Sequence, residues 1–205
     1  MLGRRGGPLL AVLALLVTGA ALRQVAWTEA VGAPVKLALL QTNIEQGLKW
    51  RPEMLQRWLD VNVAMLRDNP AEIVVLPETT LPLLVEYLPP GYLDELRRVA
   101  ADNGGDVILG TFVRNEAGNI FNAAISLGRS AAGYYAKQHL VPFGEYSPPL
   151  FRWFYELVNI PMADQTRGPE RQPPMLLAGQ KVAVNICYED AFGEELIRSL
   201  PEATL

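Results

Sequence analysis

Short apolar runs alternate with amphipathic segments along most of the chain. The runs are rich in β-branched residues and predict buried strands, at residues 35–43, 71–78, 106–113, 120–127, 133–141 and 181–186. Segments 52–67 and 92–103 instead repeat apolar residues every three or four positions, which predicts helices with one buried face. The first of these helices is expected to bury Leu55, Trp58, Leu59, Val63 and Leu66. Strands that alternate with helices, followed by a run of strands, indicate an α/β layered sheet protein.

Proline, glycine and polar residues mark the connections. Segments 45–51 and 163–174 are predicted loops, and residues 116–119 a hairpin turn. Residues 142–149 hold three prolines and cannot be regular structure. The aromatic stretch 150–159 is a helix candidate whose rings either pack in the core or form a lipid-facing lid.

The N-terminal region has the composition of a membrane segment. Arg4 and Arg5 precede an uncharged apolar run, residues 8–22. Arginines on this side favour an inside N-terminus, with the remainder of the chain delivered outside. No clean small-residue cleavage site follows, which favours a retained anchor over a cleaved signal, and the lack of a polar face disfavours a buried globular helix. We therefore expect an anchor and linker over residues 1–34 and a catalytic domain over residues 35–205.

Composition removes several classes of function. A net charge of −4 gives no electrostatic case for nucleic acid. One cysteine excludes an internal disulfide, and one histidine excludes a metal site built from several histidines. No P-loop, dinucleotide-binding glycine motif or Gly-x-Ser-x-Gly elbow is present. What remains is chemistry by cysteine, carboxylate and lysine, with no metal or cofactor predicted.

Three such groups stand at or just beyond the ends of predicted strands: Glu78, Lys137 and Cys187. Cys187 lies where a strand passes into a helix, and backbone N–H groups at such a turn favour the thiolate. As nucleophile it would hold an acyl group as a thioester, with Glu78 as general base and Lys137 stabilising the oxyanion. The alternatives are a small buried hydrophobe for the cysteine and solvated charges for the other two.

The order Glu, Lys, Cys resembles the nitrilase superfamily. Four segments are similar to one branch of it, the apolipoprotein N-acyltransferases: residues 41–50, 76–82, 135–146 and 185–189. The most specific motif among these segments is His-Leu-Val-Pro-Phe-Gly-Glu. The resemblance implies a nitrilase-like α-β-β-α sandwich preceded by one N-terminal transmembrane helix. Here that sandwich is expected to be partial, with its C-terminal half missing.

The resemblance also implies a reaction and a location. An acyl chain would pass from a phospholipid to the cysteine, and then to the N-terminal α-amine of diacylglyceryl-cysteine on an apolipoprotein. The location would be the bacterial inner membrane, with the catalytic domain on the periplasmic side. No nucleic acid, metal or cofactor is implied.

Further residues enter the site through the same resemblance. Glu145 is expected to orient the lysine, and Glu189 to tune the charge around the thiolate, with Tyr188 supporting them. The positions expected to contact substrate are Trp50, Phe143, Phe151 and Trp153.

Other functions stay open at the level of sequence. The same three groups could hydrolyse a small carbon–nitrogen bond, which would make the chain a membrane-anchored amidase. A catalytic domain of residues 35–205 is short for a complete sandwich, so an inactive truncated remnant or a tethered interaction module is also possible. In that case apolar surface would stay exposed.

Overall fold

The computed structural model describes residues 6–29, 32–148 and 164–205. The chain separates into two units, residues 1–34 and 35–205. In the first unit, α1 (Gly6–Leu22) contains the predicted apolar run. Across the described residues, no helix combines the length and the apolar character needed to cross a membrane. The transmembrane helix inferred from the sequence remains a prediction.

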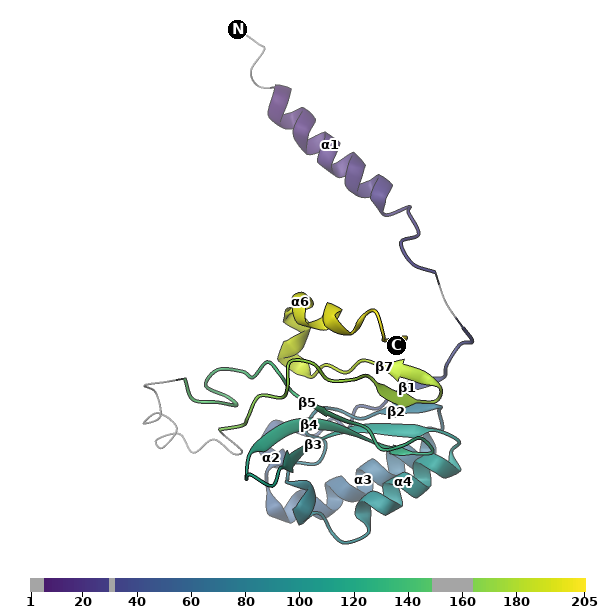
Figure 1. The fold of residues 1–205 in the computed structure, drawn as a ribbon, viewed down its shortest axis with the longest axis vertical. Helices are drawn as coiled ribbons and strands as arrows, with labels where there is room; N and C mark the ends of the chain where they lie inside the picture. The colour runs from purple at the N-terminus through teal and green to yellow at the C-terminus, as the bar shows by residue number, and fades with distance from the viewer. Residues whose placement is uncertain (1–5, 30–31, 149–163) are drawn as a thin grey trace. The chain divides into compact units, whose positions relative to one another are not determined.

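The second unit is organised around a mixed sheet with the strand order β1-β2-β3-β4-β5 (Figure 1). Its strands are β1 (Leu37–Leu39), β2 (Ile73–Val75), β3 (Asp106–Arg114), β4 (Ile120–Gly128) and β5 (Tyr134–Ala136). The pairs β1–β2 and β2–β3 are parallel, whereas β3–β4 and β4–β5 are antiparallel. Helical crossovers connect the parallel strands and short turns connect the antiparallel ones, which is the arrangement that connection length dictates.

Two amphipathic helices, α3 (Leu55–Asp68) and α4 (Tyr92–Asp102), cover one face of this sheet (Figure 1). A 3-10 turn, Pro52–Met54, leads into α3. The predicted inner stripe of α3 is confirmed, because Trp58, Leu59, Val63 and Leu66 are buried and Leu55 packs against the same cluster. These side chains exclude water between helices and sheet and supply the main apolar burial of the unit.

A separate hairpin, β6 (Met175–Leu177) and β7 (Gln180–Val182), forms a two-stranded sheet. It lies on the face of the five-stranded sheet opposite the helices (Figure 1). The contact is apolar and is made by Met175, Leu177 and Val182 from the hairpin, which cluster with Ile73 and Ile108 from the sheet. The layers are therefore helices, sheet and hairpin.

Strands β1, β2, β5 and β7 are shorter than predicted, whereas β3 and β4 have nearly the predicted bounds. Two further local predictions are wrong, and one strand was missed. Segment 45–51 is not a plain loop, because it contains α2 (Gln46–Lys49). β1 is not buried as predicted, since Leu37 and Leu39 are exposed and the strand lies at one edge of the sheet, next to β2. The strand β6 was not predicted from the sequence.

The segment leading to Cys187 also differs from the prediction. β7 ends at Val182, and the next four residues have no regular structure. Cys187 itself begins a 3-10 helix, Cys187–Ala191, followed by α6 (Gly193–Leu196) and a 3-10 turn, Ile197–Ser199. The predicted position of the thiol at the start of a helical turn is thus confirmed, although the strand before it ends earlier.

Candidate active site

The chain beyond β2 carries Glu78 into a tight turn. Thr79, the next residue, has a positive φ of 50°. Gly110 on β3 faces this turn, and a Cβ there would lie 2.4 Å from the Thr79 nitrogen and 2.7 Å from the Glu78 Cα. Only glycine allows the two backbones to approach this closely. Gly110 therefore determines where the carboxylate of Glu78 can be placed.

Lys137 follows β5 and points into the interior. Its side chain is 0% exposed, and Nζ lies 3.1 Å from Glu78 Oε1 and 2.7 Å from Glu145 Oε1. Burial alone lowers the pKa of Lys137, but hydrogen bonding to Glu145 and the charge of Glu78 outweigh it and raise the pKa above its ordinary value. The amine therefore stays an ammonium at neutral pH, and one of its three N–H bonds remains for a substrate oxygen.

A third polar group, Asn122 on β4, connects the two carboxylates. Its Nδ2 donates to Glu78 Oε1 at 2.7 Å and to Glu145 Oε1 at 3.2 Å, and the residue is 2% exposed. Its backbone oxygen accepts the Lys137 N–H at 2.8 Å. A neutral double donor between two anions reduces their repulsion without adding charge. Sequence reasoning missed this residue, although an amide inside the apolar run 120–127 was a usable signal.

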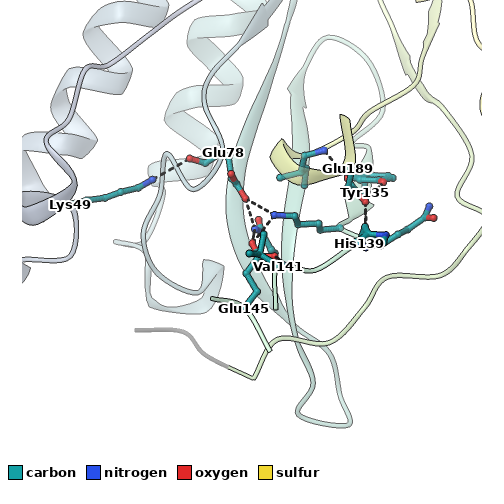
Figure 2. Close-up of polar contacts among 11 residues, drawn as sticks. Lys49, Glu78, Tyr135, His139, Val141, Glu145 and Glu189 are labelled. Atoms are coloured by element: carbon teal, nitrogen blue, oxygen red, sulfur yellow. Dashed lines mark hydrogen bonds and ion pairs between the residues drawn. The ribbon is translucent and has the colours of Figure 1, made fainter. Parts of the chain in front are cut away.

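Glu145 is held by its own loop. Its Oε2 accepts the backbone N–H of Val141 at 2.8 Å, and its backbone N–H donates to the Val141 oxygen at 2.9 Å (Figure 2). The Pro-rich segment is thus closed into a turn whose carboxylate is aimed at Lys137. This is the geometry that an orienting role for Glu145 requires.

Glu189 is a buried cross-link between two segments. Oε1 accepts the Tyr135 hydroxyl at 2.9 Å and the backbone N–H groups of Gln138 and His139 at 2.6 and 3.2 Å, and Oε2 accepts the Ile186 N–H at 2.7 Å (Figure 2). These bonds align the turn that carries the cysteine with the segment that carries the lysine. These contacts are those of a clamp, and an effect of Glu189 on the charge around the thiolate stays a prediction.

Cys187 is exposed and has a positive φ of 53°. Its exposure excludes a small buried hydrophobe, and strained backbone of this kind is concentrated at functional sites. Partial burial, the charge of Glu78 and hydrogen bonding to its carboxylate raise the pKa of the Cys187 thiol. The charge of Lys137 and the Tyr188 N–H lower that pKa by less. The Tyr188 N–H favours the thiolate, as predicted for backbone N–H groups at this turn, but the contributions that raise the pKa outweigh it. The thiol is therefore neutral near pH 7, with the Glu78 carboxylate nearby as a candidate proton acceptor.

The residues expected to contact substrate differ in position. Trp50 is partly exposed and its ring tilts against Phe112 at a centroid distance of 6.1 Å. Phe143 is 43% exposed and lies in the turn that Glu145 closes. Phe151, Trp153 and the rest of the aromatic segment lie outside the described residues.

The ring of Tyr188 belongs to an aromatic cluster that sequence reasoning did not predict. It meets His139 edge-on at 5.5 Å and Phe192 edge-on at 5.1 Å, while His139 and Phe192 stack at 3.5 Å. The cluster forms an apolar wall that begins at the residue after the cysteine.

Taken together, these groups can perform acyl transfer through a thioester. The Glu78 carboxylate lies close enough to the Cys187 thiol to raise its pKa, and a thiol beside a base is the pairing that nucleophilic catalysis needs. An ammonium N–H and a backbone N–H lie beside the thiol to receive an oxyanion. Among the described residues, no group of three or more His, Cys, Asp or Glu side chains could hold a metal ion.

The chain belongs to the carbon-nitrogen hydrolase family, whose model matches residues 36–204. It is also similar in fold to a solved structure, the NitN amidase from Neterenkonia sp. AN1, with a TM-score of 0.55 at 17% identity, over 83% of this chain and 64% of that one. The predicted nitrilase-like α/β fold is therefore confirmed.

Within that family, the chain is similar to apolipoprotein N-acyltransferases. The enzyme of Nitrosomonas europaea is 44% identical over 190 residues, which are 91% of this chain and 38% of that protein. The enzyme of Chromobacterium violaceum is 43% identical over 205 residues, 96% of this chain and 40% of that protein. The resemblance inferred from four short segments is thus confirmed over most of the chain, which spans about two fifths of the length of these relatives.

Proposed function

We propose that the protein transfers a fatty acyl chain from a phospholipid to the N-terminal α-amine of an apolipoprotein. The observation that carries the proposal is the convergence of three separate segments of the chain: Lys137 pairs with Glu78 at 3.1 Å, and both charges act on the exposed thiol of Cys187. The similarity to apolipoprotein N-acyltransferases supports the choice of donor and acceptor. The acceptor is expected to carry diacylglyceryl-cysteine at its N-terminus.

In the first step, Glu78 accepts the thiol proton as the sulfur of Cys187 attacks the ester carbonyl of the phospholipid. The Lys137 ammonium and the Tyr188 N–H stabilise the oxyanion of the tetrahedral intermediate. The carbon–oxygen bond then breaks, Glu78 returns the proton to the glycerol oxygen, and a lysophospholipid leaves. The acyl chain remains on Cys187 as a thioester.

In the second step, the α-amine of the acceptor attacks the thioester carbonyl. Glu78 takes the proton that the amine loses, the carbon–sulfur bond breaks, and the proton returns to the sulfur. The raised pKa of Cys187 suits this exchange, since a neutral thiol is the resting state and a base is needed in both directions. Glu145 and Asn122 keep Glu78 and the Lys137 ammonium in position during both steps.

The location of the protein is part of the same proposal. Both substrates carry long acyl chains, so the reaction must take place at a membrane surface. We place the protein at the bacterial inner membrane, with residues 35–205 on the periplasmic side and the apolar N-terminal segment contributing to membrane attachment.

Mass spectrometry of the full-length protein incubated with phospholipid tests the first step. An adduct of one acyl chain is expected, and hydroxylamine at neutral pH should remove it because it is a thioester. Cys187→Ala must abolish the adduct, since the chain has no other cysteine. Active protein that never carries this adduct would refute the proposal.

An amidase is the second candidate, because the family model describes carbon–nitrogen hydrolysis. Water would then replace the amine in the second step. Turnover of short amides without phospholipid or detergent would favour the amidase. Acyl transfer to a diacylglyceryl-cysteine peptide, with no release of free fatty acid, would favour the transferase.

A further inference from the structure

A second lysine lies beside the site and has no role in the steps above. Lys49 is the last residue of α2, and its Nζ donates to the backbone oxygen of Glu78 at 3.3 Å (Figure 2). The side chain is partly buried. Burial lowers the pKa of Lys49, and the charge of Glu78 restores only part of that shift. The site therefore contains an ammonium whose charge is poorly compensated.

The donors of Lys49 are mostly unused. An ammonium has three N–H bonds, and the one hydrogen bond that Lys49 makes within the described residues is to a neutral carbonyl. No carboxylate of the described residues lies within ion-pair distance of Lys49, whereas Lys137 pairs with two. A partly desolvated cation in this state gains free energy from an incoming anion.

The chemistry of the cysteine does not account for Lys49. The pKa of Cys187 responds to Glu78, Lys137 and the Tyr188 N–H. Lys49 approaches from the backbone side of Glu78, away from the carboxylate that Lys137 and Asn122 already occupy. It is thus placed to meet a part of the substrate other than the reacting carbonyl.

We infer that Lys49 binds the phosphate of the phospholipid donor, an inference that rests on the proposed function. In a phospholipid the phosphodiester is joined to the acyl esters by a short glycerol bridge. A donor with its ester carbonyl at Cys187 therefore presents an anion near Glu78. A charge-assisted hydrogen bond from Lys49 would select phospholipids over neutral glycerides and orient the ester for attack.

The test compares two donors with identical acyl chains, a phosphatidyl lipid and a diacylglycerol, in the same detergent. Formation of the acyl adduct on Cys187 is measured in the full-length protein and in Lys49→Met. We expect the ratio of the two kcat/KM values, phospholipid over diacylglycerol, to fall about 10-fold or more in the variant, mainly through KM. Lys49→Arg should restore most of the ratio, and Lys181→Met, at an exposed position, should leave it unchanged.

Several outcomes would overturn the inference. An equal loss for both donors would assign Lys49 to the support of Glu78, and no loss would make it a solvated charge. Inorganic phosphate should compete with phospholipid in the unsubstituted protein and not in Lys49→Met. If phosphate instead stimulates turnover of diacylglycerol, the position takes a free anion. Absence of any adduct in the unsubstituted protein would refute the proposed function, independently of Lys49.

Discussion

Lys137→Met removes the ammonium that lies between two carboxylates in the interior of the site. Methionine preserves most of the apolar length of the side chain, so the change is principally one of charge. Glu78 and Glu145 then share the Asn122 amide as a neutral donor, and Glu145 also keeps its bond from the Val141 N–H. The variant is expected to lose both stability and acyl-enzyme formation.

The magnitude follows from the exposure of the groups left behind. Removing one partner of a buried ion pair typically costs about 3–5 kcal/mol. The Lys137 side chain is 0% exposed, but those of Glu145 and Glu78 are 14% and 30% exposed, so water can hydrate part of the remaining charge. We therefore expect a loss near the lower end, about 3 kcal/mol in the free energy of unfolding.

The pH dependence of this effect has a defined sign. In the unsubstituted protein the pKa of Lys137 is raised above 10.5. Its stabilisation is therefore fully present below that pH and is lost as pH rises through the folded-state pKa.

Denaturation by urea, followed by tryptophan fluorescence, measures the loss. Lys181→Met, an exposed lysine on β7, is the matched control. The double variant Lys137→Met with Glu145→Gln should recover about 1 kcal/mol or more, because it removes one of the stranded charges. If the free energy of unfolding of Lys137→Met lies within about 0.5 kcal/mol of that of the control, the ion pairs contribute nothing to stability and the expectation is refuted.

Three further outcomes are expected. The rate of Cys187 alkylation by iodoacetamide should rise with pH, and the pH of its inflection should lie above that of an ordinary cysteine. Glu78→Gln should shift this inflection to lower pH, because the Glu78 charge raises the pKa of the thiol. Asn122→Asp, which places a third carboxylate between two others, should reduce acyl-enzyme formation more than Asn122→Ala does, and an equal effect of both would contradict the role of a neutral donor. Gly110→Ala should lower both the thermal midpoint and the acylation rate, since its Cβ would overlap the turn at Glu78, and unchanged kinetics would show that this contact does not position the base.

The pattern of apolar and polar residues correctly predicted the features of this protein that depend on which side of an element is buried. The faces of α3 and α4, the β3–β4 hairpin and the α/β class follow from periodicity, which reflects which side of an element meets the core. Glu78, Lys137 and Cys187 were recognised as candidates from their places in short characteristic segments. The lengths of β1, β2, β5 and β7 were overestimated, because an apolar run is buried by any packing and need not pair in a sheet.

What the tertiary structure decided is how these groups act on one another. Glu78 and Lys137 are 59 residues apart in the chain, and only the sheet brings them to 3.1 Å. Asn122 and the clamp at Glu189 became visible only through such contacts. The direction in which the pKa of Cys187 shifts depends on burial and on the distances to nearby charges. Spacing in the sequence gives neither of these. The sequence by itself determined which reactive groups are present, and the fold determined that burial and the charge of Glu78 keep the thiol of Cys187 neutral near pH 7.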